Sequence, residues 1–175
     1  MSILKVARMG HPVLRTTARA LGRSDIRSAA VQQLIDDMID TMVEYRGVGL
    51  AAPQVHEGLR LFVAVLDAGD ADPAESEPVV VINPEITPVG KDIVEGWEGC
   101  LSIPDIRGQV PRAKEINVQA LDRRGDRIEL HLQDFPARVA QHETDHLDGV
   151  LFFDRMRSFE TLTFLEEYSR YWAKD

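Results

Sequence analysis

The sequence predicts an α+β fold in which short strands form mainly antiparallel sheets and helices lie before and after them. A helical spacing of apolar residues covers about residues 25–45, ahead of every strand-like segment. Several short aliphatic runs then follow, with turn residues between them. A second helical segment over residues 136–148 comes after the last of these runs. Strands grouped together between helices are typical of α+β domains.

The first helix is expected over residues 25–45, where apolar side chains recur every three to four positions. Ser24 is a suitable N-cap because its hydroxyl accepts a hydrogen bond from a free backbone N–H of the first turn. Gly47 ends the pattern, since glycine readily leaves the helical conformation. The segment that follows, GVGLAAPQ at 47–54, is therefore expected to be a loop or an irregular strand.

Two strands and a loop are expected next. Residues 59–66 form an aliphatic run, and residues 79–82 form a second, which Asn83-Pro84 closes. The segment 67–78, DAGDADPAESEP, contains acidic residues, proline and glycine but few large apolar groups. Such a composition cannot bury enough apolar surface to order itself, so we expect a mobile acidic loop on the surface.

A hairpin and a helix complete the central part of the chain. Strands are expected at 116–121 and 127–132, with Gly125 in the turn that joins them. Pro136 suits the first turn of a helix that continues to Asp148, because proline needs no hydrogen-bond acceptor there. This second helix carries the most informative motif of the sequence.

A last amphipathic stretch predicts a C-terminal helix over residues 158–175. Leu165, Tyr168 and Trp172 recur at helical spacing and would share one face. We expect this face to pack on the body of the protein or on a second subunit, so the protein would be a monomer or a homodimer.

Composition restricts the classes of function. The chain of 175 residues fits one domain over 1–175, and its net charge of −9 argues against direct binding to nucleic acid or to an anionic membrane. The longest strongly apolar run, Leu61–Leu66, is too short to span a bilayer. The single cysteine, Cys100, and the lack of an apolar leader sequence favour a cytoplasmic protein.

The segment QHETDHLDG contains the pattern His142-Glu143-x-x-His146 within the predicted second helix. Side chains four positions apart lie one turn apart on the same helix face. Two imidazoles at this spacing can bind one metal ion, and Glu143 between them can carry a proton. The pattern therefore predicts a catalytic metal site.

The residues alone leave the third protein ligand open. Glu166 or Glu167 would complete the ligand set of a zinc endopeptidase, while Cys100 offers a thiolate, which also binds metals strongly. A copper site with two histidines and a cysteine would have no use for Glu143. A metal-stabilised binding module without catalytic activity is a further alternative.

Three motifs stand out along the chain, and in order they are Gly47–Gln54 (GVGLAAPQ), Glu98–Ser102 (EGCLS) and Gln141–Leu147 (QHETDHL). In this combination they resemble the motifs of peptide deformylase. Two shorter segments, Gly10–Arg15 and Val110–Arg112, support the match, which covers about residues 5–157. The resemblance implies an α+β fold built around the metal-binding HExxH helix, and it selects Cys100 as the third ligand.

The resemblance implies a hydrolase that removes the N-formyl group, as formate, from the N-terminal formylmethionine of newly made polypeptides. One Fe²⁺ ion would be bound by Cys100, His142 and His146, and Zn²⁺, Ni²⁺ or Co²⁺ could replace it. A water activated by the metal would attack the formyl carbon, with Glu143 as general base and then general acid.

The remaining implied roles concern the substrate. Gln54, through its side-chain amide, and Leu101, through its backbone N–H, would stabilise the oxyanion. The peptide would pair as an added strand with the backbone of its binding site. The residues expected to bind substrate are Val48, Gly49, Glu98, Arg107 and Val139.

The resemblance also has consequences for partners. Nascent formylated peptides are the implied substrate, and a transient association with the ribosome is compatible with it. Residues 155–175 carry four basic and four acidic side chains, so stable docking on ribosomal RNA through this segment is not supported. One departure from the family pattern, Gly96-Trp97 before the second motif, is closer to organellar members and leaves the shape of the substrate pocket open.

Overall fold

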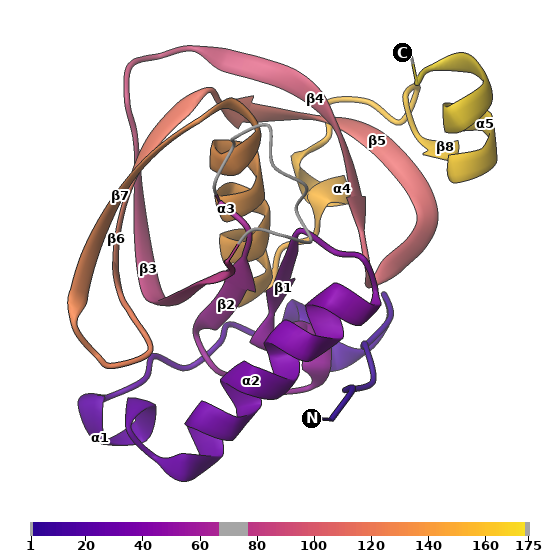
Figure 1. Ribbon diagram of the computed structural model, residues 1–175. Coiled ribbons are helices and arrows are strands. Elements are labelled where there is room, and N and C mark those ends of the chain that lie inside the picture. The colour runs from indigo at the N-terminus through magenta and orange to yellow at the C-terminus, as the bar shows by residue number, and fades with distance from the viewer. Residues whose placement is uncertain (1, 67–76, 174–175) are drawn as a thin grey trace.

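The computed structural model describes residues 2–66 and 77–173, and two antiparallel sheets with flanking helices confirm the α+β prediction. One sheet has five strands in the order β1-β2-β3-β6-β7, and the other has three in the order β4-β5-β8 (Figure 1). In chain order the elements are η1 (Pro12–Arg15), α1 (Arg23–Ile26), α2 (Ala29–Glu44), β1 (Gly49–Ala51), η2 (Ala52–Val55), β2 (Leu61–Ala64), β3 (Val79–Pro88), β4 (Ile93–Cys100), β5 (Ile103–Ala113), β6 (Glu115–Leu121), β7 (Arg127–Gln133), α3 (Asp134–Leu147), α4 (Phe152–Arg155), β8 (Thr163–Phe164) and α5 (Leu165–Tyr171).

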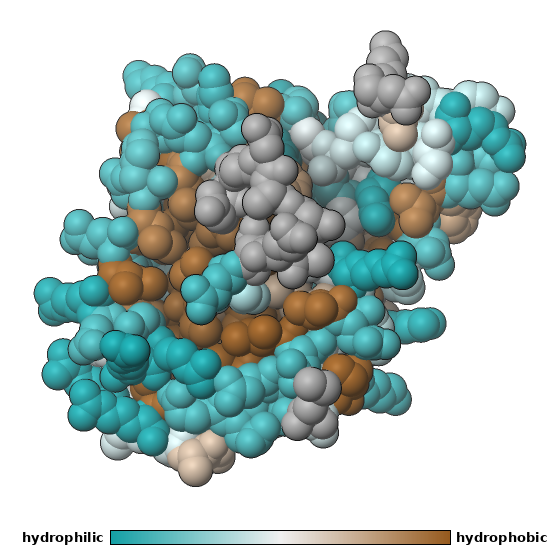
Figure 2. Space-filling model, in the orientation of Figure 1, coloured by the Kyte–Doolittle hydropathy of each residue, from teal (hydrophilic) through white to brown (hydrophobic). Residues whose placement is uncertain are grey.

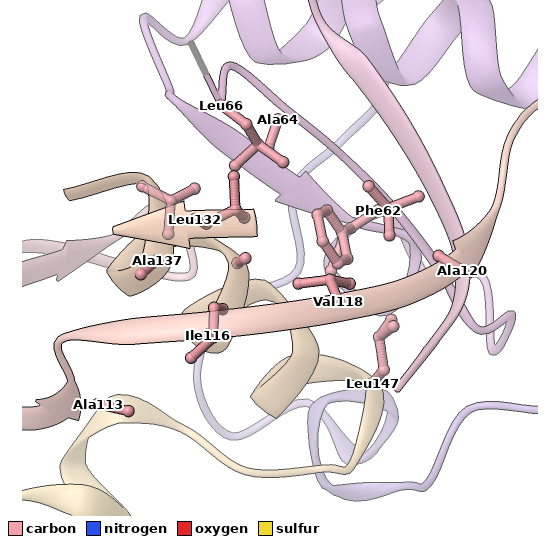
Figure 3. Close-up of a cluster of buried hydrophobic side chains, with 14 of the residues drawn as sticks. Phe62, Ala64, Leu66, Ala113, Ile116, Val118, Ala120, Leu132, Ala137 and Leu147 are labelled. Carbon is pink, nitrogen blue, oxygen red and sulfur yellow. The ribbon is translucent and has the colours of Figure 1, made fainter. Parts of the chain in front are cut away.

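The five-stranded sheet is covered on both faces, which explains why β2 is apolar throughout. Alternate side chains of a strand point to opposite faces. Leu61 and Val63 therefore join the core on the α2 side, whereas Phe62 and Ala64 join the core on the α3 side. Figure 3 shows the second of these cores, where Phe62 lies close to Val118. This packing holds α3 against β1 and β2.

The first long helix begins later than expected. Ser24 lies in the separate short helix α1, and α2 begins after Ser28, whose Oγ accepts a hydrogen bond from the backbone N–H of Val31 at 3.3 Å. Ser28 Oγ also donates to the Asp25 carbonyl at 2.6 Å, and this contact fixes the junction between the two helices. The prediction of one helix capped by Ser24 was therefore wrong, because a separate short helix precedes α2 and Ser28 is the cap of α2.

Strand β3 is longer than predicted. It runs past Asn83-Pro84 because Asn83 has a positive φ of 51° and forms a bulge, at which the pairing with β6 shifts register. The side-chain amide of Asn83 makes two hydrogen bonds with the backbone of Leu21. Asn83 Nδ2 donates to the Leu21 carbonyl at 2.8 Å, and the Leu21 N–H donates to Asn83 Oδ1 at 2.9 Å. A proline is tolerated at such a bulge because the regular ladder is already interrupted there.

The long hairpin of β4 and β5 was not predicted. Its sequence is interrupted by Gly96, Gly99, Pro104, Gly108 and Pro111, so it lacks a clear alternating pattern. The two strands nevertheless pair from Ile93–Ala113 to Cys100–Ile103, and the pairing places Cys100 at the end of β4. In Figure 1, α3 stands between the five-stranded sheet and this hairpin, and it contacts both.

The C-terminal helix is shorter than the predicted 158–175. Within the described residues 158–173, the helix covers only Leu165–Tyr171, and Thr163–Phe164 instead forms β8, which pairs with β5. The apolar face does pack on the body at Tyr168 and Trp172, as described below, while Phe159 is exposed. Most of the predicted acidic loop, residues 67–76, lies outside the described residues. No helix of the described part is long and apolar enough to cross a membrane.

Candidate functional site

Three side chains with metal-binding atoms meet where the end of β4 faces α3. The donor atoms of Cys100, His142 and His146 all lie within 4.8 Å of one another, and all three residues are buried. Cys100 Sγ is 3.3 Å from His146 Nε2. The two imidazoles lie one helical turn apart, as the sequence spacing requires, while the hairpin register brings in the thiol from a separate sheet.

Glu98 supports one of the two imidazoles. Its Oε2 lies 2.9 Å from His142 Nδ1, which leaves the other ring nitrogen, Nε2, available to a ligand. Metal-bound histidines usually have such a carboxylate partner. Burial favours a higher pKa for Glu98, but the hydrogen bonds with His142 and Arg112 outweigh it and hold this pKa well below its usual range. Glu98 is therefore an anion that orients His142.

A buried ionic network surrounds this pair, and the sequence did not reveal it. Arg112 donates to both oxygens of Glu98 at 2.9 and 3.0 Å and to Asp145 at 2.6 Å. Arg138 donates to Glu98 at 2.9 Å, and Arg155 donates to Asp145 at 2.8 Å. Buried charges persist only when they are paired and hydrogen-bonded. Arg112 and Asp145 do lie in matched segments, but their spacing in the chain, 33 residues, does not indicate that they pair.

The charges of the three donors suit a divalent ion that prefers sulfur and nitrogen. Burial favours a higher pKa for Cys100, but the charge of His146 and hydrogen bonds with both histidines hold this pKa well below its usual value. Burial opposes charge on His142 as well, yet its bonds with Cys100 and Glu98 raise its pKa, so binding of a metal ion to this ring would release a proton. A thiolate beside two imidazoles is a strong donor set for such ions, and it leaves coordination positions for water or substrate.

Glu143 lies next to the donors and lines the adjoining cavity. Its Oε2 is buried and has no hydrogen-bond partner among the described residues. Burial raises the pKa of this carboxyl, although the charges of His142 and His146 oppose the shift. Gly49 makes room for the side chain, since a Cβ at Gly49 would lie only 2.8 Å from Glu143 Cδ. A carboxylate placed in this way can accept a proton from a molecule in the cavity.

The amide of Gln54 has a defined orientation. Its Oε1 accepts a hydrogen bond from the backbone N–H of Ala51 at 2.9 Å, so its NH₂ group points the other way. Nε2 lies 3.5 Å from Cys100 Sγ and 3.2 Å from Ser102 Oγ. A buried N–H donor therefore lies beside the thiol.

A cavity of about 770 Å³ opens beside the three donors. The strand β1 borders it and is an edge strand, because within the described residues it pairs only with β2. A free strand edge can bind an extended peptide by backbone hydrogen bonds. Every residue predicted to bind substrate or stabilise the oxyanion lines this cavity, namely Val48, Gly49, Gln54, Glu98, Leu101, Arg107 and Val139.

The alternative ligands of an endopeptidase do not join this site. Glu166 and Glu167 lie on α5, where both form ion pairs with Arg170. Their side chains are 78% and 45% exposed, whereas the three donors are buried. The group of candidate ligands in the described part of the chain contains Cys100 and neither of these glutamates.

Two histidines one helical turn apart, a cysteine beside them, a buried glutamate and an adjoining cavity form the arrangement expected of a metal-dependent hydrolase. The family model described as polypeptide deformylase matches residues 3–161. The chain is 45% identical to peptide deformylase 2 of Nostoc sp., over 99% of this chain and 97% of that protein. The chain therefore belongs to the polypeptide deformylase family, whose members are metal-dependent and remove the N-formyl group from nascent polypeptides.

Solved structures agree with this membership. A class I type b peptide deformylase from Acinetobacter baumannii matches with a TM-score of 0.81 and 41% identity, over 89% of this chain and 100% of that one. The peptide deformylase of Thermus thermophilus matches with a TM-score of 0.78 and 44% identity, over 88% of this chain and 86% of that one. The chain thus has the peptide deformylase fold.

Proposed function

We propose that this chain hydrolyses the N-formyl group of the N-terminal formylmethionine of newly made polypeptides and releases formate. The observation that carries the proposal is the cluster of Cys100, His142 and His146 beside Glu143, whose buried Oε2 has no hydrogen-bond partner in the described part of the chain. Family membership supports the same reaction. The substrate is made during translation, so we also propose that the enzyme acts in the cytoplasm and associates only transiently with the ribosome.

Cys100, His142 and His146 would hold one metal ion, which makes α3 the metal-binding helix of the fold. We propose Fe²⁺ as this ion, with Zn²⁺, Ni²⁺ or Co²⁺ as replacements that the same donors accept. When bound, the ion supplies Lewis acidity, which polarises the formyl oxygen and lowers the pKa of water. Glu98 then has a supporting role through His142, and we prefer this role to the direct substrate contact that the sequence suggested.

Glu143 would move the protons of the reaction. Its buried Oε2, which has no hydrogen-bond partner among the described residues, would accept a proton from the attacking water, and a carboxyl with a raised pKa would give that proton to the departing amine. Gln54 Nε2 and the backbone N–H of Leu101 would donate to the oxygen that becomes negative in the transition state. The bond from Ala51 supports this role for Gln54, because it fixes the amide orientation in advance.

The peptide would lie along the free edge of β1, at Val48 and Gly49. An added strand is bound mainly through its backbone, so this arrangement tolerates many sequences after methionine. Val139 precedes His142 by three positions on α3 and is buried, which suits a place beside the methionine side chain. Arg107 lies across Gly99, where a Cβ would come within 2.7 Å of its Nε, and so presents its guanidinium to the cavity.

The proposal is tested by measuring formate released from formyl-Met-Ala-Ser under anaerobic conditions by the metal-loaded protein. Acetyl-Met-Ala-Ser and an unformylated peptide of ten residues serve as controls. We expect formate from the formylated peptide and no cleavage of the controls. Cleavage of internal peptide bonds would identify an endopeptidase instead, and failure to act on any peptide while fully metallated would favour a binding module.

Gly49→Ala is expected to lower kcat by about a hundredfold while the protein still binds one metal ion. The added methyl group overlaps Glu143 and forces its carboxylate to move, and a displacement of about 1 Å can cost this much. Gly58→Ala is the matched control, because a Cβ at Gly58 meets nothing within 4 Å. Equal kcat values for Gly49→Ala and wild type would contradict the placement of Glu143.

Oxygen sensitivity tests the choice of metal. The Cys100 thiolate beside ferrous iron is open to oxidation, so we expect the iron form to lose activity in air. The nickel and cobalt forms should keep their activity under the same conditions. The measurement is the half-life of formate release in air for each form, with mass spectrometry of the Cys100 peptide. Equal half-lives for the iron and nickel forms would count against this prediction.

A further inference from the structure

The C-terminal segment 163–172 lies outside the part of the chain that the family model matches, yet it is attached to the body at the cavity. Its strand β8 pairs with β5 at Ile106–Phe164 and Arg107–Thr163, so it lies beside the proposed substrate residue Arg107. The backbone N–H of Gln109 donates to Thr161 Oγ1 at 3.1 Å and extends this attachment. Figure 2 shows α5 standing out from the body at the upper right.

The helix α5 holds the side chain of Trp97. The ring of Tyr168 lies edge-on to Trp97 at 4.9 Å between centroids, and that of Trp172 lies at 5.6 Å. Trp97 itself lines the cavity and directly precedes Glu98 in β4. Edge-to-face and tilted contacts of this kind are among the favoured arrangements of aromatic pairs. The C-terminal segment therefore helps to hold Trp97, a residue of the cavity lining, in its observed orientation.

Leu165, the first residue of α5, also lines the cavity. It is half-buried, as is Trp97, whereas Val139 is only 5% exposed. Trp97 of β4 and Leu165 of α5 are therefore two apolar side chains of the cavity lining that are more exposed than Val139. We call Trp97 and Leu165 the outer wall.

We propose that the outer wall, held in place by α5, makes the enzyme prefer formylated peptides with a large apolar third residue. The inference rests on the proposed function. In an extended peptide, residues one and three point to the same side and lie about 7 Å apart. If the methionine side chain lies at Val139, the third side chain points the same way and reaches the outer wall.

The test compares kcat/KM for formyl-Met-Ala-Leu and formyl-Met-Ala-Ser in wild type, Tyr168→Ala, Leu165→Ala and Tyr171→Ala. Tyr171 is the matched control, because it lies on the same helix but is 65% exposed. We expect wild type and Tyr171→Ala to prefer the leucine peptide by about tenfold, and the other two variants to prefer it by less than about threefold. Tyr168→Ala removes a side chain that contacts Trp97, and Leu165→Ala shortens the outer wall itself. We call these two the wall variants, and together they keep the test decisive if one of them folds poorly.

Binding of the deformylated product Met-Ala-Leu gives a readout independent of turnover. Both tryptophans of the chain, Trp97 and Trp172, belong to the aromatic cluster. Saturation with this peptide should therefore change tryptophan fluorescence in wild type, with weaker binding in Tyr168→Ala. Formate release without any preference at the third residue, or a preference unchanged in both wall variants, would overturn the inference. Absence of formate from wild type with either peptide would instead contradict the proposed function.

Discussion

Glu143→Gln is expected to retain one metal ion and to lose formate release by a factor of about 10²–10⁴. The substitution keeps the shape of the side chain but removes the oxygen that accepts the proton. Since Glu143 is buried with an unpaired oxygen, a neutral amide should also fold without loss of stability. The measurements are kcat for formyl-Met-Ala-Ser, metal content and the melting temperature of both proteins.

Glu129→Gln is the control for this substitution, because Glu129 is an exposed carboxylate on β7 and does not line the cavity. It should leave kcat unchanged. A Glu143→Gln protein with one metal ion per chain and a kcat close to that of wild type would show that proton transfer uses another group. Loss of the metal from this variant would instead show that Glu143 helps to build the metal site.

Cys100→Ala is expected to lose both the metal and the activity. Two imidazoles remain, but the thiolate that completes the group of candidate ligands found among the described residues is gone. Wild type should also melt at a higher temperature when the metal is added, because a ligand that binds the folded state stabilises it. The variant should not show this shift.

The result for Cys100→Ala separates the deformylase site from the endopeptidase alternative. A variant that kept one ion and its activity would require a ligand other than Cys100. The exposed positions of Glu166 and Glu167 on α5 make that outcome contrary to the structure. Glu167→Gln is a suitable control, and it should affect neither metal content nor formate release.

The part of the candidate site that depends on the spacing of residues along one helix was predictable from the sequence. His142 and His146 are four positions apart, and a helix places such residues on one face whatever surrounds it. Cys100 was different, because its distance from the histidines depends on the register of β4 and β5. The residues alone leave Glu166 and Glu167 as alternatives, and it is the family resemblance that selects the cysteine.

The buried ionic network around Glu98 was not predictable from the sequence. Glu98, Arg112 and Asp145 come from two strands and a helix, and the Glu98–Arg112 pair is separated by 14 residues. The sequence does not indicate which residue a charged side chain will pair with, and most charged side chains are solvated at the surface. Burial of these charges becomes visible only when the hairpin is folded onto α3. The same holds for Trp97, whose contacts with Tyr168 and Trp172 join distant segments.

The errors in the predicted bounds of helices and strands have a similar cause. The helical period located α2 and α3, but the choice between Ser24 and Ser28 as cap depended on the contact of Ser28 with Asp25. The glycines and prolines in β4 and β5 gave these segments a low strand propensity, so the two long strands were not predicted. The two segments are strands because they pair with each other. Periodicity alone led to a predicted C-terminal helix that includes Thr163 and Phe164, whereas in the structure these two residues pair with β5.

Features that depend on neighbours along the chain follow from the sequence alone: the α+β class, the HExxH segment with its two imidazoles and its glutamate, and the family motifs. Features that join distant segments follow only from the folded chain. These are the approach of Cys100 to the histidines, the pairing of Glu98 with His142, and the contribution of Leu165 from α5 to the cavity lining. The two groups differ because periodicity and capping act over a few residues, whereas strand register and burial are set by the packing of the whole chain.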